Sequence, residues 1–155
     1  MTTDEIHKAI TDYLSIFEGR IELRDGQKEK LLLALDRLAL AYHFAGCDFD
    51  GADYPEAPEP DLHHLRSITA ALFPDFGYYN IATDISVNVG QTTLGVGDAL
   101  NDISEIAAVM LEVNWLWKNA SVENALWQFR WGYENHWGAH LRNLQLYIRA
   151  VDNGV

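Results

Sequence analysis

The sequence predicts an all-α fold, a single-domain bundle of about five helices with a long acidic loop containing prolines and an irregular segment before the fourth helix. Three observations predict it. Apolar residues recur three or four positions apart over most of the chain, as they do on one face of a helix. Residues that favour helix N-termini precede four of these stretches. The 155 residues, 48 % of them hydrophobic, suit one globular domain spanning 1–155.

The N-terminal part of the chain predicts two amphipathic helices. Thr2 and Glu5 have the spacing of a capping box, and the helix that they open is expected to end at Gly19. A second helix is predicted from Asp25 to Ala45, with Gly46 as its left-handed cap. The apolar positions that would face the core are Ile6, Ala9, Ile10, Tyr13, Leu14 and Phe17 in the first helix, and Leu31, Leu32, Leu35, Leu38, Ala39 and Tyr42 in the second.

A loop and a short helix follow. Residues 46–60 carry three of the four prolines, so this stretch cannot form regular structure. Asp61 is a suitable N-cap for a third helix, which would stop at Pro74. The apolar positions expected to point inward are Leu62, Leu65, Ile68, Thr69 and Leu72.

The segment 74–97 has no clear periodicity. Ile85, Val87 and Val89 alternate as in a short strand, but no second strand is evident to pair with them. Because an isolated strand is not stable, the segment is predicted to be irregular or short-helical.

The C-terminal part predicts a fourth helix, opened by Asp98 and ending near Lys118, and a fifth from Ser121 to about Ala150. Within the fifth helix, Gly132 and Gly138 weaken the interior, which suggests that another backbone or a ligand approaches closely there. The expected core face of this helix is formed by Leu126, Phe129, Tyr133, Trp137, Leu141, Leu144 and Ile148.

Trp127 and Trp131 lie one turn apart on the other side of the fifth helix. Two interpretations are open. The helix is central and packed on both sides, with Trp115 or Trp117 covering one of the two indoles. Alternatively, the pair forms an exposed aromatic patch for a partner or for self-association, because tryptophan is enriched at such interfaces.

Histidines supply the candidates for metal binding. His136 and His140 are four positions apart on one helix face, a usable spacing for two metal ligands, although the motif lacks the interposed base of a zinc peptidase. His140 also falls near the middle of the apolar arc, which favours a hydrogen-bonded core histidine. His63 and His64 open the third helix, where the helix dipole favours neutral rings. His63 could therefore join a His/carboxylate site holding a divalent metal. No cofactor-binding motif is present.

The loop contains Asp48, Asp50 and Asp53, which with Glu59 partly match the ligand positions of a calcium loop. The glycine stands at the wrong position and prolines intervene, so a solvated loop is expected instead. The G-x-G before Asp98 is not a phosphate site, because the carboxylate stands where a phosphate would bind. Cys47 is expected to be a packed thiol.

The formal charge of −12 is unevenly distributed. Residues 47–114 hold 12 acids and one base, Arg66, whereas residues 1–46 carry −2 and residues 115–155 carry +1. This charge argues against nucleic acid and anionic membranes as partners. Acidic residues interrupt the start of the chain, so no secretory signal is expected there, and a cytoplasmic location is predicted. A binding surface is expected within residues 47–66, where a basic partner would be attracted.

Four segments resemble one known family: HFAGCDFDGADYPEAPEPD, FPDFGYYN, VGDALNDI and ALWQFRWGYENHWGAHLRNLQLYI. The family consists of small all-helical bacterial proteins catalogued only as a domain of unknown function. The resemblance covers roughly residues 35 to 150, and the last segment is the most specific. It implies a single cytoplasmic α-helical domain, and it assigns no catalytic residue.

Two functions are therefore considered. The leading hypothesis is a non-enzymatic binding module whose partner is a basic protein or a second copy of the chain, with interaction residues Trp127, Trp131, Asp48, Asp50 and Asp53. The alternative is a metal-binding bundle or metal-dependent enzyme that uses His136 and His140 with a carboxylate.

Overall fold

The computed structural model describes residues 1–18, 26–46 and 48–155. The predicted limits at Gly19 and Asp25 and the packing of Cys47 lie outside these residues. The elements in chain order are α1 (Thr3–Ser15), the short η1 (Ile16–Glu18), α2 (Gln27–Tyr42), α3 (Leu62–Leu72), β1 (Tyr78–Ala82), β2 (Leu94–Asp98), α4 (Ala99–Asn119), α5 (Val122–Gly132), the π-helical turn η3 (Tyr133–Trp137) and α6 (Gly138–Asn153).

Four of the predicted helix starts are confirmed. Thr2 and Glu5 form the reciprocal capping box of α1. The side chains of Asp61, Asp98 and Ser121 accept hydrogen bonds from backbone N–H groups in the first turns of α3, α4 and α5. The prediction for Gly46 is wrong: α2 already ends at Tyr42 with a right-handed cap at His43.

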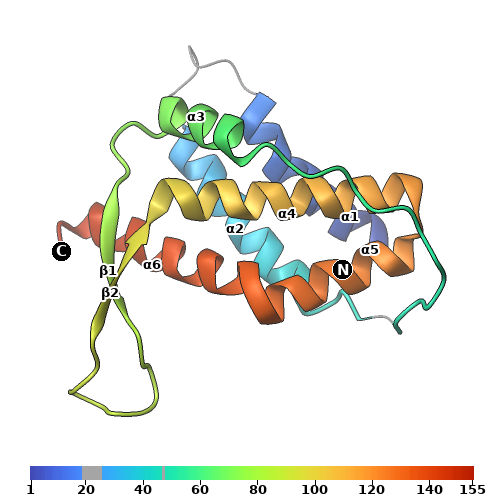
Figure 1. Ribbon diagram of the computed structural model, residues 1–155. Coiled ribbons are helices and arrows are strands. Elements are labelled where there is room, and N and C mark those ends of the chain that lie inside the picture. Colours follow the sequence, from blue (N-terminus) through green and yellow to red (C-terminus); the bar gives the residue numbers. More distant parts are fainter. Residues whose placement is uncertain (19–25, 47) are drawn as a thin grey trace.

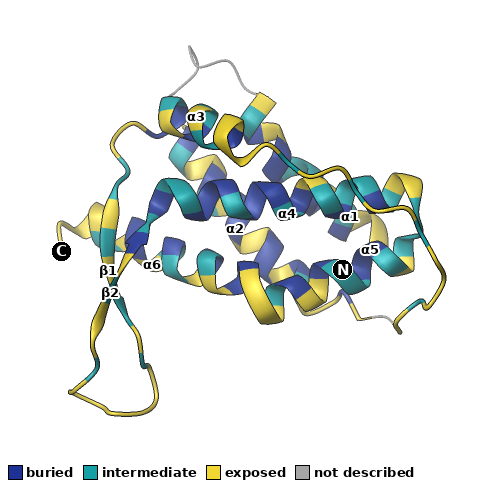
Figure 2. Cartoon of the chain, in the orientation of Figure 1, coloured by how far each residue is buried: buried dark blue, intermediate teal, exposed yellow. Residues whose placement is uncertain are grey.

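The mostly helical fold is confirmed, with α4 at its centre. α4 packs against α1, α3, α5 and α6, and α2 closes the bundle by packing on α1 and α6 (Figure 1). The buried residues form one hydrophobic core along these contacts (Figure 2). The largest fully buried side chains are Trp137, Tyr13, Phe129, Ile6, Ile10, Leu31, Leu35, Leu38, Ile103, Ile106, Met110 and Leu141.

The prediction for segment 74–97 is wrong, because the chain forms an antiparallel hairpin here. β1 pairs with β2 from Tyr78↔Asp98 to Ala82↔Leu94. Ile85, Val87 and Val89 lie in the loop between the strands, fully on the surface. The second strand, LGVGD, gives no strand signal in the sequence, because its two glycines interrupt the alternation of apolar and polar residues. Gly97 is needed there because the ring of Tyr79 lies against it, where a Cβ would clash.

The predicted fifth helix is a continuous helical run whose middle is the π-turn η3. All the expected core positions of this run are buried except Tyr133, which is half-buried. Contacts within this turn explain both Gly132 and Gly138. A Cβ on Gly132 would lie 2.9 Å from the Trp137 ring, and one on Gly138 would clash with the Tyr133 carbonyl. No described helix is both long and apolar enough to span a membrane.

Candidate functional site

The acidic loop is attached to the start of α5 through Asp50. Its carboxylate accepts hydrogen bonds from Tyr54 Oη at 2.5 Å and Ser121 Oγ at 3.1 Å, and from the backbone N–H of Ala52. These bonds, the one from Tyr54 first, lower the pKa of the Asp50 carboxyl. Asp50, one of the predicted interaction residues, therefore fixes the course of the loop. Asp48 and Asp53 are exposed on either side of it.

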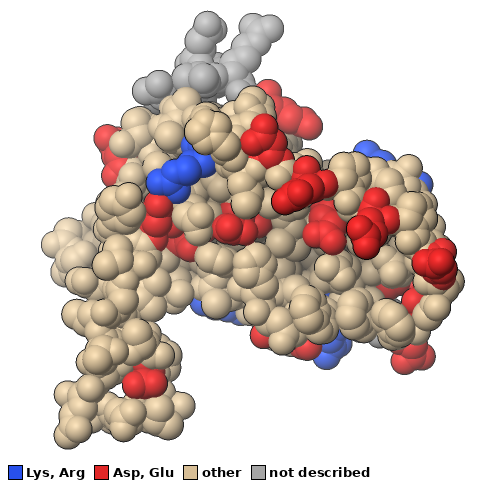
Figure 3. Space-filling model, in the orientation of Figure 1, with Lys and Arg blue, Asp and Glu red and all other residues tan. Residues whose placement is uncertain are grey.

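Beyond Asp50 the loop and the helices α4 and α5 line an open groove of about 430 Å³. We call it the acidic groove; its charged lining residues are Asp53, Glu56 and Glu112, and its amide lining residues are Asn124 and Gln128. None of the three carboxylates forms an ion pair within the described residues. On the face shown in Figure 3, acidic side chains gather along the course of the loop, with few basic ones among them. The groove is thus a local concentration of uncompensated negative charge.

Glu112 is the least solvated of these carboxylates. It projects from α4, is half-buried, and has one hydrogen-bond donor, Gln128 Nε2, at 3.4 Å from its Oε1. Burial raises the pKa of the Glu112 carboxyl, because the charged form loses hydration without gaining a cation. A positively charged group in the groove would supply what this side chain lacks.

The two tryptophans of α5 stack on one another. The rings of Trp127 and Trp131 are 6.0 Å apart and nearly parallel, and Phe49 from the loop meets Trp127 edge-on at 4.8 Å. Phe49 and Trp131 remain 63 % and 48 % exposed. We call Phe49, Trp127 and Trp131 the aromatic stack. Trp117, which was considered as a cover for one of the indoles, stacks instead on His7.

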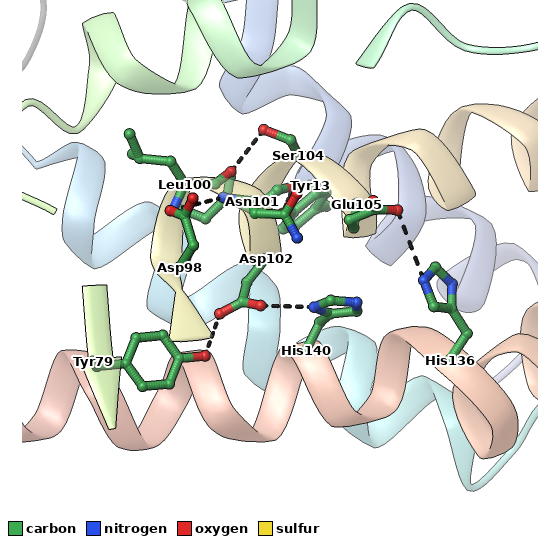
Figure 4. A network of polar contacts seen from close by, with 11 residues as sticks. Tyr13, Tyr79, Asp98, Leu100, Asn101, Asp102, Ser104, Glu105, His136 and His140 are labelled. Atoms are coloured by element: carbon green, nitrogen blue, oxygen red, sulfur yellow. Dashed lines mark hydrogen bonds and ion pairs between the residues drawn. The ribbon is translucent and has the colours of Figure 1, made fainter. Parts of the chain in front are cut away.

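A second polar cluster lies at the other end of α4, around the buried carboxylate of Asp102 (Figure 4). Its Oδ1 lies 2.6 Å from Nδ1 of His140, and its Oδ2 accepts a hydrogen bond from the hydroxyl of Tyr79. The cluster therefore joins α4, α6 and β1. The hydrogen bond to Asp102 raises the pKa of His140, against the effect of burial. Burial, followed by the same carboxylate, raises the pKa of Tyr79.

The three histidines predicted as metal ligands do not form one site. His136 and His140 each contact a carboxylate of α4, and His63 lies on another helix. The rings of His136 and His140 meet edge to face at 5.1 Å, and His136 Nε2 lies 3.7 Å from Glu105 Oε2. His63 is exposed in the first turn of α3. Within the described residues, no three or more His, Cys, Asp or Glu side chains are grouped so that they could hold a metal ion. His63 is therefore not brought together with the other two histidines.

Sequence reasoning missed four residues of these clusters: Phe49, Glu112, Tyr79 and Asp102. Asp102 and Glu112 did carry a signal, because each interrupts the apolar periodicity of α4 close to positions that face the core. An acidic residue at such a position is expected to have a partner. The contacts of Phe49 and Tyr79 join segments far apart in sequence and leave no local signal.

The comparisons with known proteins agree with the fold. The model of the family described as Domain of unknown function (DUF5063) matches residues 3–152. The chain belongs to this family. The resemblance seen in the sequence, to a family known only as a domain of unknown function, is thereby confirmed, and no activity comes with it. No curated protein sequence matches the chain.

One similar solved structure is the crystal structure of protein BF1032 from Bacteroides fragilis. It has a TM-score of 0.74 and 17 % sequence identity, over 95 % of this chain and 89 % of that chain. At this identity the similarity concerns the fold alone.

Proposed function

We propose that this protein is a binding module for a cationic, arginine- or lysine-rich segment of a partner protein, which lies along α5 across the acidic groove and the aromatic stack. One observation carries the proposal: the groove places three carboxylates together without any basic partner among the described residues. Glu112, half-buried among them, has a raised pKa because its charge is poorly solvated. A guanidinium or ammonium group would relieve this penalty.

The aromatic stack supports the same class of partner. Trp127 of the stack and Gln128 of the groove are consecutive residues of α5, so the two features lie on neighbouring sides of the same helix. Indole faces attract cations, and this attraction contributes about 0.5–2 kcal/mol depending on solvation. Arg130, the nearby base, already pairs with Glu134 at 3.2 Å and so offsets the local charge only weakly. Alternating basic and apolar residues would therefore match the surface best.

The exposed carboxylates of the loop would act at longer range. Asp48 and Asp53 belong to the stretch that carries −11 of the total charge, and such a field speeds the approach of a basic partner. The groove and the stack would then set affinity at short range.

The test is a fluorescence-anisotropy titration of the full chain against a labelled peptide of alternating arginine and leucine. A peptide with citrulline in place of arginine is the control ligand. We expect the arginine peptide to bind and the citrulline peptide not to bind. The affinity for the arginine peptide should fall at least tenfold as the salt concentration rises from about 50 to 500 mM. Glu112→Gln should weaken it about tenfold and Trp131→Ala about fivefold, by loss of roughly 1 kcal/mol or more each.

Glu29→Gln is the matched control variant, because it removes the same charge from an exposed position on α2. It should retain nearly the affinity of the unsubstituted protein. Equal affinity for the citrulline peptide, or equal weakening by Glu29→Gln and Glu112→Gln, would contradict the proposal.

A further inference from the structure

We infer that the chain forms a two-fold symmetric dimer through its hairpin, with the hairpin of each copy covering the apolar groove at the base of the other's. The inference concerns a surface far from the acidic groove and does not rest on the proposed function. The hairpin of β1 and β2 projects from the helical body, beside the C-terminal end of α6 (Figure 1).

The projecting hairpin is apolar and bare. The register alternates the side chains, so Tyr78, Leu94 and Val96 share the outer face. These three are 73 %, 68 % and 77 % exposed, and the apolar residues of the loop are similarly exposed (Figure 2). Two-stranded hairpins are only marginally stable unless they are packed. Here just the inner face is packed, by contact of the Tyr79 ring with Tyr147 on α6.

A complementary groove lies at the root of the same hairpin. Its volume is about 630 Å³, and it runs between β1 and α6, lined by side chains from both faces of the strand. Among the described residues, no charged side chain lines it. Its apolar lining includes Ile81, Leu146, Tyr147, Val151 and Val155, of which Leu146 and Val155 are largely exposed and Val151 is about half exposed. The molecule therefore carries an apolar projection and an apolar recess side by side.

Charge identifies a second copy as the occupant. The hairpin, residues 78–98, contains two charged side chains, Asp84 and Asp98, in a chain of net charge −12, and Asp98 is paired with Arg66 at 2.8 Å. The projecting part of the hairpin is almost uniformly uncharged in Figure 3. Two copies repel one another over the acidic middle of the chain, but they can approach here without opposing charges. A cationic or anionic partner would gain nothing from this surface. A projection and a recess on one surface are also what an isologous interface requires, because each copy must offer both.

The available area is sufficient for a dimer. Nine apolar side chains, eight of the hairpin and α6 together with Val155, are roughly half to nine-tenths exposed. Burial of a single Val, Leu or Ile side chain removes on the order of 60–100 Å² from water, so they can bury on the order of 600 Å² per copy. Stable interfaces bury about 800 Å² per partner including their polar rims, and monomers seldom expose larger apolar patches than this one.

Sedimentation velocity of the full chain over a wide range of concentrations tests the inference. We expect a concentration-dependent species of twice 17.5 kDa. Val96→Arg, on the outer face, and Ile85→Asp, at the hairpin loop, should each weaken dimerisation at least tenfold. Leu33→Asp is the control, because Leu33 is a similarly exposed leucine on α2, and it should leave the dimer unchanged. Thermal unfolding of each variant identifies any that no longer fold. Because two positions are substituted, the test still works if one of the two variants fails to fold.

A chain that stays monomeric at every concentration would overturn the inference, as would a dimer that neither hairpin variant weakens. Sedimentation with uncharged phosphatidylcholine vesicles distinguishes the remaining occupant. If the chain stays monomeric and binds these vesicles through the hairpin, the inference is wrong and the occupant of the apolar surface is a lipid membrane. Peptide binding at the acidic groove is measured separately, so either proposal can fail alone.

Discussion

His140 and Asp102 lie 38 positions apart in sequence, and their Nδ1 and Oδ1 atoms are 2.6 Å apart in the structure. The Asp102 carboxylate is almost completely buried and also accepts a hydrogen bond from the hydroxyl of Tyr79. One side chain of α4 thus holds both the last helix and the first strand of the hairpin. This cluster fixes the root of the hairpin against the bundle.

The first prediction concerns the protonation of His140. Its pKa should lie above the ordinary histidine value of about 6.5. Asp102→Asn should lower it, because the substitution removes the carboxylate that favours the imidazolium. Titration of the histidine ring protons by NMR measures both values. Asp84→Asn removes a carboxylate from the hairpin loop and should leave the titration of His140 unchanged, and an unchanged pKa in Asp102→Asn would contradict the assignment.

Stability should depend on pH with a defined sign. Because the folded-state pKa of His140 is raised, its contribution to the free energy of unfolding is fully present below about pH 6.5 and is lost as the pH rises through the folded-state value. His140→Gln should therefore cost more stability at about pH 6 than at about pH 9, roughly 1–3 kcal/mol at the lower pH. Urea unfolding of both proteins at the two pH values measures this. A larger cost at the higher pH would reverse the expected sign.

Tyr79→Phe should loosen the hairpin locally. The substitution removes the hydroxyl that donates a hydrogen bond to Asp102 but keeps the ring against Gly97 and Tyr147. We expect a loss of about 1–3 kcal/mol and faster hydrogen exchange at the amides of β1 and β2. Tyr78→Phe is the matched control, since Tyr78 is exposed and its hydroxyl should contribute little. Equal exchange rates in the two variants would show that the hydroxyl of Tyr79 has no such role.

At the π-turn, replacing glycine by alanine is expected to change stability in the direction opposite to that given by helix propensity. Replacing a glycine inside a helix by alanine ordinarily stabilises by up to about 1 kcal/mol. Gly138→Ala should instead destabilise by about 1–3 kcal/mol, because its Cβ would clash with the carbonyl of Tyr133. Gly77→Ala, where a Cβ would meet nothing within 4 Å, is the control. Chemical denaturation compares the two, and a stabilised Gly138→Ala protein would refute this explanation of the turn.

The sequence predicted what depends on local chemistry. The helix starts at Thr2, Asp61, Asp98 and Ser121 follow from side chains that accept hydrogen bonds from amides two or three residues further along the chain. The core face of the last helix was also predicted nearly completely, since its period depends on adjacent turns alone.

The remaining features depend on contacts between distant segments. The hairpin escaped prediction because Gly95 and Gly97 interrupt the alternation of β2, and the reason for Gly97 is a ring eighteen positions earlier. The groove beside α5 escaped because Glu112 comes from α4 and Asp53 from the loop. Nothing in the spacing of these residues shows that they meet.

The central claim is that a cationic segment binds along α5, and the most direct measurement is a ¹H–¹⁵N NMR titration of the labelled chain with the arginine–leucine peptide. We expect shifts of the indole N–H signals of Trp127 and Trp131, and of the side-chain amide of Gln128 in the acidic groove. The amides of the hairpin should be unaffected. Shifts confined to other parts of the molecule, or no shifts at saturating peptide, would contradict the proposed function.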